Sequence, residues 1–132
     1  MEKTIVDKHG NINGKVWIGV DFDGTLVKRA HWDGKGQGIP GEPVPLMVKR
    51  VKKWIKEGKT VKIFTARVSS IYSKKDRIDG IRLIKSWCRE HIGQELEVTA
   101  EKDGSMIELW DDRAIQVVPD TGITLESMMP RR

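Results

Sequence analysis

The sequence predicts a single α/β domain built as a three-layer sandwich, with helices on both faces of a mainly parallel central sheet. Apolar strand patterns alternate with amphipathic helix patterns along most of the chain. A length of 132 residues suits one domain with one hydrophobic core. Polar residues follow several of the predicted strands, and parallel strands bring such ends to one edge of the sheet. We therefore expect one domain over residues 1–132.

Composition narrows the class of protein. Hydrophobic residues make up 38% and charged residues 33%, as in soluble globular domains. No apolar stretch is long enough to span a membrane, and the N-terminus lacks the pattern of a signal peptide. A single cysteine, Cys88, allows no internal disulfide, which fits a reducing compartment. We expect a cytoplasmic protein without a membrane partner. The sequence makes no prediction about oligomeric state.

The first elements are strands separated by turn-forming residues. A short strand is expected at 4–6, followed by a turn-rich link. The strongest strand pattern covers 15–21, where Val, Trp and Ile are concentrated. A glycine-rich stretch at about 25–43 then predicts a long loop, or flap, and loops of this length in compact domains are usually functional.

The central part of the chain alternates helix and strand. A helix opens at 42–45, with proline in its first turn, and ends before Gly58. A strand follows at 59–64. A second helix is expected at 74–91, with Ile78 on its apolar face. The last expected strands are 96–99, 107–110 and 114–118. Trp54, Trp87 and Cys88 lie on the apolar helix faces and are predicted to belong to the core.

Carboxylates and a threonine follow three of these strands. Asp21 ends the first long strand and Asp23 comes two residues later, while Thr65 ends the second strand and Asp111 follows the strand at 107–110. Charged groups at the edge of a core are costly unless they are paired or bind a metal. Because the ends of parallel strands share one edge, these groups are expected to meet in one crevice.

These residues resemble the signature motifs of the haloacid dehalogenase-like (HAD) superfamily of phosphohydrolases. Residues 21–25 (DFDGT) are similar to its first motif, DxDGT, and Thr65 is similar to the second. Lys102 stands where the third motif has its lysine, without the proline that often follows there. Asp111 and Asp112 are similar to the fourth motif. The order matches the family, and the segments GEPVP and IFTAR are similar to small uncharacterised HAD-like proteins of bacteria and phages.

The resemblance implies roles for four residues in phosphomonoester hydrolysis. Asp21 would be the nucleophile that forms an aspartyl-phosphate. Asp23 would protonate the leaving oxygen and later help to deprotonate water. Thr65 would donate its hydroxyl to the phosphoryl oxygens, and Lys102 would hold nucleophile and phosphate by charge. The second aspartate favours phosphate chemistry over dehalogenation, because the dehalogenases of the family lack it.

The resemblance also implies a Mg²⁺ ion as cofactor. Its expected ligands are the Asp21 side chain, the Asp23 main-chain carbonyl and the pair Asp111 and Asp112. Adjacent residues of a strand point to opposite faces, so we favour Asp111 as the direct ligand of the pair. The alternative is an acidic turn in which Asp112 pairs with Arg113.

Four residues are candidates for substrate binding. Phe22 lies within the first motif, and the backbone N–H near Ala66 could bind a phosphoryl oxygen. Arg67 could contact a substrate phosphate or pair with a surface acid. Trp32, in the glycine-rich loop with His31, could stack on a base or cover the edge of the core.

The intervals between the motifs are too short for the cap domains that the family uses to select substrates. An uncapped site and a net charge of +5 favour nucleotides or nucleic-acid ends as the phosphorylated substrate. The leading hypothesis is a Mg²⁺-dependent phosphatase. The alternative is a basic nucleic-acid-binding module with a vestigial or regulatory metal site. A phosphate-accepting receiver domain fits the residues after Asp21 less well.

Overall fold

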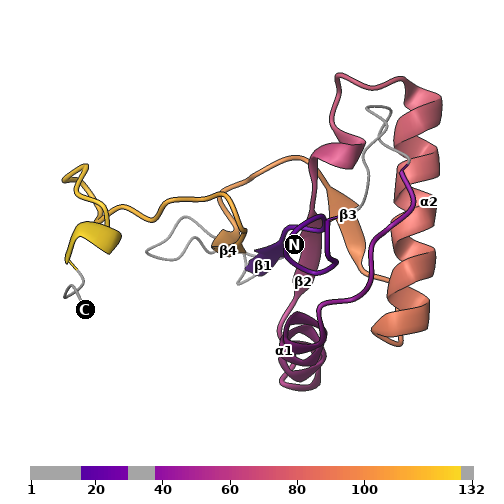
Figure 1. Cartoon of the computed structure of the whole chain (residues 1–132), viewed down its shortest axis with the longest axis horizontal. Helices are drawn as coiled ribbons and strands as arrows, with labels where there is room; N and C mark the ends of the chain where they lie inside the picture. Colours follow the sequence, from indigo (N-terminus) through magenta and orange to yellow (C-terminus); the bar gives the residue numbers. More distant parts are fainter. Residues whose placement is uncertain (1–15, 30–37, 129–132) are drawn as a thin grey trace, which may run out of the picture.

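The computed structural model describes residues 16–29 and 38–128, and its centre is a four-stranded parallel sheet with the strand order β3-β2-β1-β4 (Figure 1). The strands are β1 (Trp17–Val20), β2 (Val61–Phe64), β3 (Glu97–Thr99) and β4 (Met106–Trp110). Every pairing between them is parallel. The predicted α/β class and parallel sheet are therefore confirmed, and no cap domain occurs in the described segments. The strand expected at 4–6 lies outside them.

The register of the sheet places one apolar row on one face. Ile18 pairs with Val61, Val20 with Ile63, and Ile63 with Val98. Paired residues in neighbouring strands project to the same side, and alternate residues project to opposite sides. These five side chains are buried in one cluster. They form the apolar face of the sheet on which the helices pack.

Helix α1 (Pro45–Lys56) joins β1 to β2. It begins with proline at its first position, where the missing N–H costs no hydrogen bond. Met47 and Val51 point into the core, and Trp54 packs against it. Gly58 follows the helix with a φ of +83°, a left-handed conformation that favours glycine. The predicted start and end of this helix are confirmed.

Helix α2 (Lys74–His91) joins β2 to β3 and has the predicted bounds. Ser73 caps its start by accepting a hydrogen bond from the backbone N–H of Asp76 at 3.1 Å. Trp87 and Cys88 are buried, as predicted, and burial raises the pKa of the Cys88 thiol to about 11. Ile78 was expected in the core but is 38% exposed, because it lines a surface cavity together with Val68 of the short 3₁₀ helix η1 (Ala66–Val68).

Both helices send their buried side chains into the same core cluster. Crossovers between parallel strands are right-handed as a rule, so the two successive steps from β1 to β2 and from β2 to β3 place α1 and α2 on one face of the sheet. In Figure 1, α2 lies beside β3 and α1 lies below β2. The described segments thus show the sheet and one helical layer of the expected sandwich. On the other face, Trp17 packs near Met106 and lies under the Lys62 ammonium group.

The connection from β3 to β4 is anchored to the start of β1. The indole N–H of Trp17 donates a hydrogen bond to Asp103 at 2.9 Å, and this bond lowers the pKa of the Asp103 carboxyl. The backbone N–H of Trp17 also donates to the Ser105 carbonyl. These contacts set where β4 begins, and therefore which residues follow it at the opposite end of the sheet.

The strand expected at 114–118 is not formed. After Trp110 the chain leaves the sheet and runs away from it (Figure 1). Val117 makes only an isolated antiparallel bridge with Thr124, and a second 3₁₀ helix, η2 (Glu126–Met128), follows. Ile115 and Val117 are exposed, because this segment does not pair with a strand of the sheet. No helix in the described ranges is long and apolar enough to cross a membrane.

The packing of α2 on the sheet predicts a contrast between two isoleucines of the same helix. Ile84→Ala should lower the free energy of unfolding by about 2–5 kcal/mol, because Ile84 is fully buried and truncation leaves a cavity. Ile78→Ala should cost less than about 1 kcal/mol. Urea unfolding followed by circular dichroism measures both. Equal losses would contradict the assignment of Ile84 to the core.

Candidate functional site

The turn after β1 brings two aspartates to the carboxyl edge of the sheet. The backbone N–H of Asp21 donates to the Trp110 carbonyl at 2.9 Å and so continues the pairing of β1 with β4. The chain then turns sharply at Gly24, which has a φ of +90°. A Cβ atom at Gly24 would lie 2.7 Å from an oxygen of Asp112. Both its conformation and this close approach require glycine in the motif.

Three carboxylates meet at this edge. One oxygen each of Asp21, Asp111 and Asp112 lies within 4.8 Å of the other two. Asp21 follows β1 and the other two follow β4, which is the convergence that the strand ends predicted. Carboxylate oxygens are the ligands that hard divalent cations such as Mg²⁺ prefer. The donor set therefore fits such an ion.

The pKa of Asp21 reflects this crowding. This pKa is raised from 3.8 to about 7, mainly by burial and in addition by a hydrogen bond with Asp112 and by the charges of Asp111 and Asp112. A cation at this point would stabilise the ionised forms of all three groups. The raised pKa of Asp21 and the oxygen donors of the cluster are thus both consistent with a site for a cation.

Asp112 is already engaged with two other side chains. Arg29 Nη2 donates to one of its oxygens at 2.5 Å, and the Thr25 hydroxyl donates to the other at 3.2 Å. The contact with Arg29 is the main cause of a lowered pKa for Asp112. Asp111 accepts a hydrogen bond from the backbone N–H of Arg113 at 2.6 Å. The alternative pairing of Asp112 with Arg113 is therefore replaced by a pairing with Arg29.

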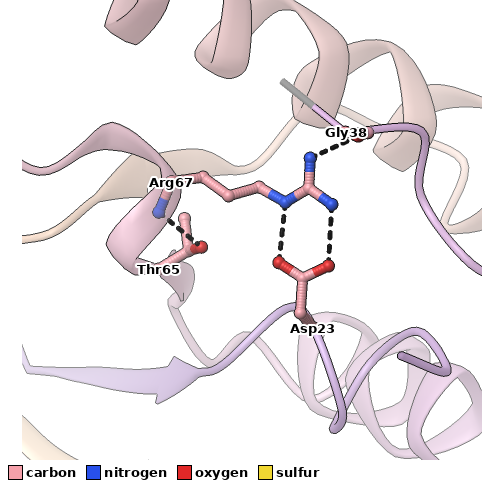
Figure 2. A network of polar contacts seen from close by, with 4 residues as sticks. All are labelled: Asp23, Gly38, Thr65 and Arg67. Carbon is pink, nitrogen blue, oxygen red and sulfur yellow. Dashed lines mark hydrogen bonds and ion pairs between the residues drawn. The ribbon is translucent and has the colours of Figure 1, made fainter. Parts of the chain in front are cut away.

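Asp23 forms an ion pair with Arg67, as Figure 2 shows. Arg67 Nε donates to one carboxylate oxygen at 2.6 Å and Nη2 donates to the other at 2.7 Å. The third guanidinium nitrogen, Nη1, donates to the Gly38 carbonyl at 2.5 Å. The Arg67 side chain is only 1% exposed. The sequence left two partners open for Arg67, a substrate phosphate or an acidic side chain. In the structure its partner is an acidic side chain, that of the second aspartate of the first motif.

Thr65 ends β2 directly beside this ion pair. It is buried, and its hydroxyl oxygen accepts a hydrogen bond from the backbone N–H of Arg67 at 3.2 Å (Figure 2). This bond caps the short helix η1. The hydroxyl hydrogen remains available for an acceptor, since accepting a bond uses only a lone pair. Thr65 therefore combines a structural cap with a donor at the sheet edge.

These groups surround one cavity of about 720 Å³. Six of the predicted site residues line it: Asp21, Asp23, Thr65, Ala66, Arg67 and Asp111. Arg29, Ser69, Tyr72 and Arg113 also line it, although the sequence analysis assigned them no role in the site. The lining holds both carboxylates and guanidinium groups, which together suit a cation and an anionic ligand.

Three described residues that were predicted for the site do not line the cavity. One is Asp112, which contacts Thr25 and Arg29; the others are Phe22 and Lys102. The Phe22 side chain is fully buried and packs edge-on against Trp87 with ring centroids 5.3 Å apart, so this side chain does not face the cavity, and the role of Phe22 in substrate binding stays a prediction. Lys102 is exposed in the β3–β4 connection and does not line the cavity, although Ala100 of the same connection does. Its expected contact with the nucleophile is not formed in this structure. Trp32 and His31 lie outside the described residues.

Thr25 and Arg29 are the main contacts that the sequence analysis missed. Thr25 belongs to the first motif, so the motif itself was the available signal. Arg29 has no comparable signal, because its contact with Asp112 joins residues 83 positions apart in the chain. An arginine among 24 basic residues has no distinctive local pattern.

Comparison with known proteins supports the fold. No family model matches the sequence, and a search of curated proteins finds no match. Among solved structures, the chain is similar to a conserved protein coded by a locus of Bacteroides thetaiotaomicron. The TM-score is 0.50 at 22% sequence identity, and the alignment covers 79% of this chain and 81% of that one. At this identity the similarity concerns the fold alone.

The raised pKa of Asp21 predicts a pH-dependent effect of Asp21→Asn on the metal-free protein. In the folded chain the pKa is about 7, against an ordinary value of 3.8, so protonation of Asp21 favours folding. That contribution is complete below about pH 4 and is lost as the pH rises through 7. At pH 8 the variant should be more stable by about 1–2 kcal/mol, allowing for solvent screening of the partly exposed carboxylate.

The measurement is thermal unfolding in EDTA between pH 4.5 and pH 8. The gain should shrink as the pH falls. Glu126→Gln, at a carboxylate without an ion pair among the described residues, serves as the control and should change stability little at any pH. A gain for Asp21→Asn that is the same at both ends of this range would contradict the raised pKa.

The ion pair between Arg67 and Asp23 predicts strong coupling in a double-mutant cycle. Arg67→Met should cost about 2–4 kcal/mol, because it leaves a carboxylate and the Gly38 carbonyl without their donors. Asp23→Asn combined with Arg67→Met should cost less than the sum of the two single changes. Lys75→Met, which breaks an exposed ion pair with Asp79, should cost under about 0.5 kcal/mol. Additive losses at Arg67 and Asp23 would rule out the coupling.

Proposed function

We propose that the protein is a Mg²⁺-dependent phosphatase that hydrolyses phosphomonoesters through an aspartyl-phosphate on Asp21. The observation that carries the proposal is the convergence of Asp21, Asp111 and Asp112 at the edge of the sheet. Thr65 and Arg67 line the same cavity. Phosphoryl transfer requires carboxylates that bind a cation and, next to them, hydrogen-bond donors that bind the phosphoryl oxygens. The likeness of residues 21–25 to the DxDGT motif supports the same chemistry.

The metal site in this proposal consists of carboxylates from two strands. Asp21, Asp111 and Asp112 would hold the ion, with the Asp23 main-chain carbonyl as a further ligand. Bound there, Mg²⁺ supplies positive charge that keeps Asp21 ionised and offsets the charge of the phosphoryl oxygens. The raised pKa of Asp21 supports this assignment, because without a cation the Asp21 carboxyl group would be only about half ionised near pH 7.

The reaction in this proposal has two steps. A carboxylate oxygen of Asp21 attacks phosphorus, the bond from phosphorus to the ester oxygen breaks, and the leaving oxygen takes a proton from Asp23. A water molecule then gives its proton to Asp23 and attacks the same phosphorus, which releases phosphate and restores Asp21. Thr65 donates its hydroxyl to a phosphoryl oxygen in both steps.

The ion pair of Arg67 adds a condition to the role of Asp23. Both Asp23 oxygens accept hydrogen bonds from Arg67, so Asp23 cannot present a proton to a leaving group in this arrangement. A substrate phosphate offers the guanidinium group an alternative bidentate acceptor. Binding of substrate would therefore move hydrogen bonds of Arg67 from Asp23 to the phosphoryl oxygens and leave Asp23 able to carry a proton.

The proposed substrates are nucleotides or nucleic-acid ends. The described segments contain no cap domain over the cavity, so a phosphate on a large molecule can enter it. A net charge of +5 favours polyanions over neutral partners.

A panel of phosphate esters tests the proposal. It contains 5′- and 3′-nucleotides, end-phosphorylated oligonucleotides and phosphopeptides, each with Mg²⁺ or with EDTA. Phosphate release should require Mg²⁺ and fall at least about 10³-fold in Asp21→Asn, as expected when a nucleophile is lost. Asp120→Asn, in an exposed turn, is the matched control and should retain activity. Acid-quenched protein should carry a phosphoryl group on the peptide that contains Asp21.

Release that persists in Asp21→Asn would exclude this mechanism. The absence of release from every ester, together with salt-dependent nucleic-acid binding that Asp21→Asn leaves unchanged, would instead support the alternative of a binding module.

A further inference from the structure

A second cavity of about 680 Å³ lies beside the candidate active site. It is bounded by the segment after η1, the first turns of α2 and the end of β3, which lie together in Figure 1. Ser69 and Ala100 line both cavities. The two spaces are therefore neighbours with a shared wall, and a ligand larger than a single phosphate could occupy both.

The rim of this second cavity is basic and polar. Lys74 and Arg77 both line it, and neither has an ion-pair partner among the described residues. The Arg77 Nε atom and the Ser69 Oγ atom are buried without a hydrogen-bond partner in the described part of the chain. Buried donors without acceptors are costly, and arginine is particularly suited to phosphate oxygens. One carboxylate, that of Glu101, also lies in the lining.

Much of the remaining lining of this cavity is apolar. Its lining includes the side chains of Val68, Ile78, Ile81 and Val98. The exposure of Ile78, which the helical pattern did not predict, belongs to this surface. Cationic donors beside an apolar wall suit a ligand that combines an anionic group with a flat or apolar one. A nucleotide has this combination, since its phosphate is charged and its base and sugar offer apolar surface.

We infer that the second cavity binds the nucleotide next to the scissile phosphate, so that the preferred substrate is the phosphorylated end of an oligonucleotide. This inference rests on the proposed phosphatase function and specifies its substrate class. Lys74 and Arg77 bind the phosphodiester that follows the terminal phosphate, and the apolar wall takes the adjoining sugar or base. A phosphopeptide fits less well, because it carries no obligatory second phosphate for these two cations.

The test compares substrates with and without nucleotides next to the terminal phosphate. Thymidine monophosphate and a thymidine pentanucleotide, each phosphorylated at the 5′ or the 3′ end, are assayed with Mg²⁺. The protein should prefer the pentanucleotide in kcat/KM at one of the two ends. In Lys74→Ala/Arg77→Ala the ratio of pentanucleotide to mononucleotide kcat/KM should fall about 10- to 100-fold, the effect of one or two hydrogen bonds to a charged group.

Lys75→Ala is the matched control, because Lys75 neighbours Lys74 but pairs with Asp79 and does not line the cavity. It should keep the preference of the unchanged protein. Fluorescence anisotropy of a labelled, end-phosphorylated pentanucleotide with Asp21→Asn protein provides a second readout that does not need turnover. Adding Lys74→Ala/Arg77→Ala to that variant should weaken binding by a similar factor, and raising the salt concentration should weaken it further.

The outcomes separate the two proposals. Turnover that depends on Asp21 but is equal for mononucleotide and pentanucleotide, and insensitive to Lys74 and Arg77, would overturn the subsite alone. A phosphopeptide preferred over the pentanucleotide, with the preference lost in the double variant, would overturn the assignment to nucleic acid. Absence of turnover with every substrate would overturn the phosphatase. In that case, oligonucleotide binding that is unchanged by Lys74→Ala/Arg77→Ala in the anisotropy assay would overturn the subsite as well.

Discussion

The buried guanidinium group of Arg67 joins three segments that are distant in the sequence. It binds Asp23 in the turn after β1, it follows Thr65 at the end of β2, and it donates to the carbonyl of Gly38 in the segment that leads to α1. A buried arginine is tolerated only when its donors are satisfied. The positions of these three segments are therefore coupled, and the shape of the cavity depends on one side chain that has almost no contact with solvent.

The charges around this cavity are partly compensated within the chain. Arg67 pairs with Asp23 and Arg29 pairs with Asp112. Asp21 and Asp111 have no cationic partner among the described residues, and the pKa of Asp21 is raised as a result of burial and of its acidic neighbours. The uncompensated negative charge is thus confined to the point where two strands end. That is the point at which a divalent cation would contribute most to stability and, in the proposed reaction, to phosphate binding.

The second cavity differs from the first in the charge of its lining. The first cavity is lined by three carboxylates together with arginines, whereas the second, which shares Ser69 with it, is lined by Lys74 and Arg77 and a single carboxylate. A substrate with one phosphate near Asp21 and a second near these cations would be complementary to both regions. The short intervals between the strands leave this surface open in the described structure. Selectivity in the proposed function is therefore assigned to the linings of the two cavities.

The sequence by itself determined the α/β class, the order and bounds of the main elements, and the residues that follow the strands, among them Asp21, Thr65 and Asp111. These properties depend on local periodicity, on helix-terminating residues and on the rule that parallel strands end at one edge. Only the tertiary structure decided that Arg67 pairs with Asp23, that Phe22 packs in the core, that Lys102 stays away from the cavity, and that 114–118 joins no sheet. Each of these outcomes depends on distances between segments far apart in the chain. A long polar side chain such as that of Arg67 can reach several partners, and the local sequence does not select one of them. An apolar strand pattern such as 114–118 forms a strand only where a neighbouring strand is available to pair with it.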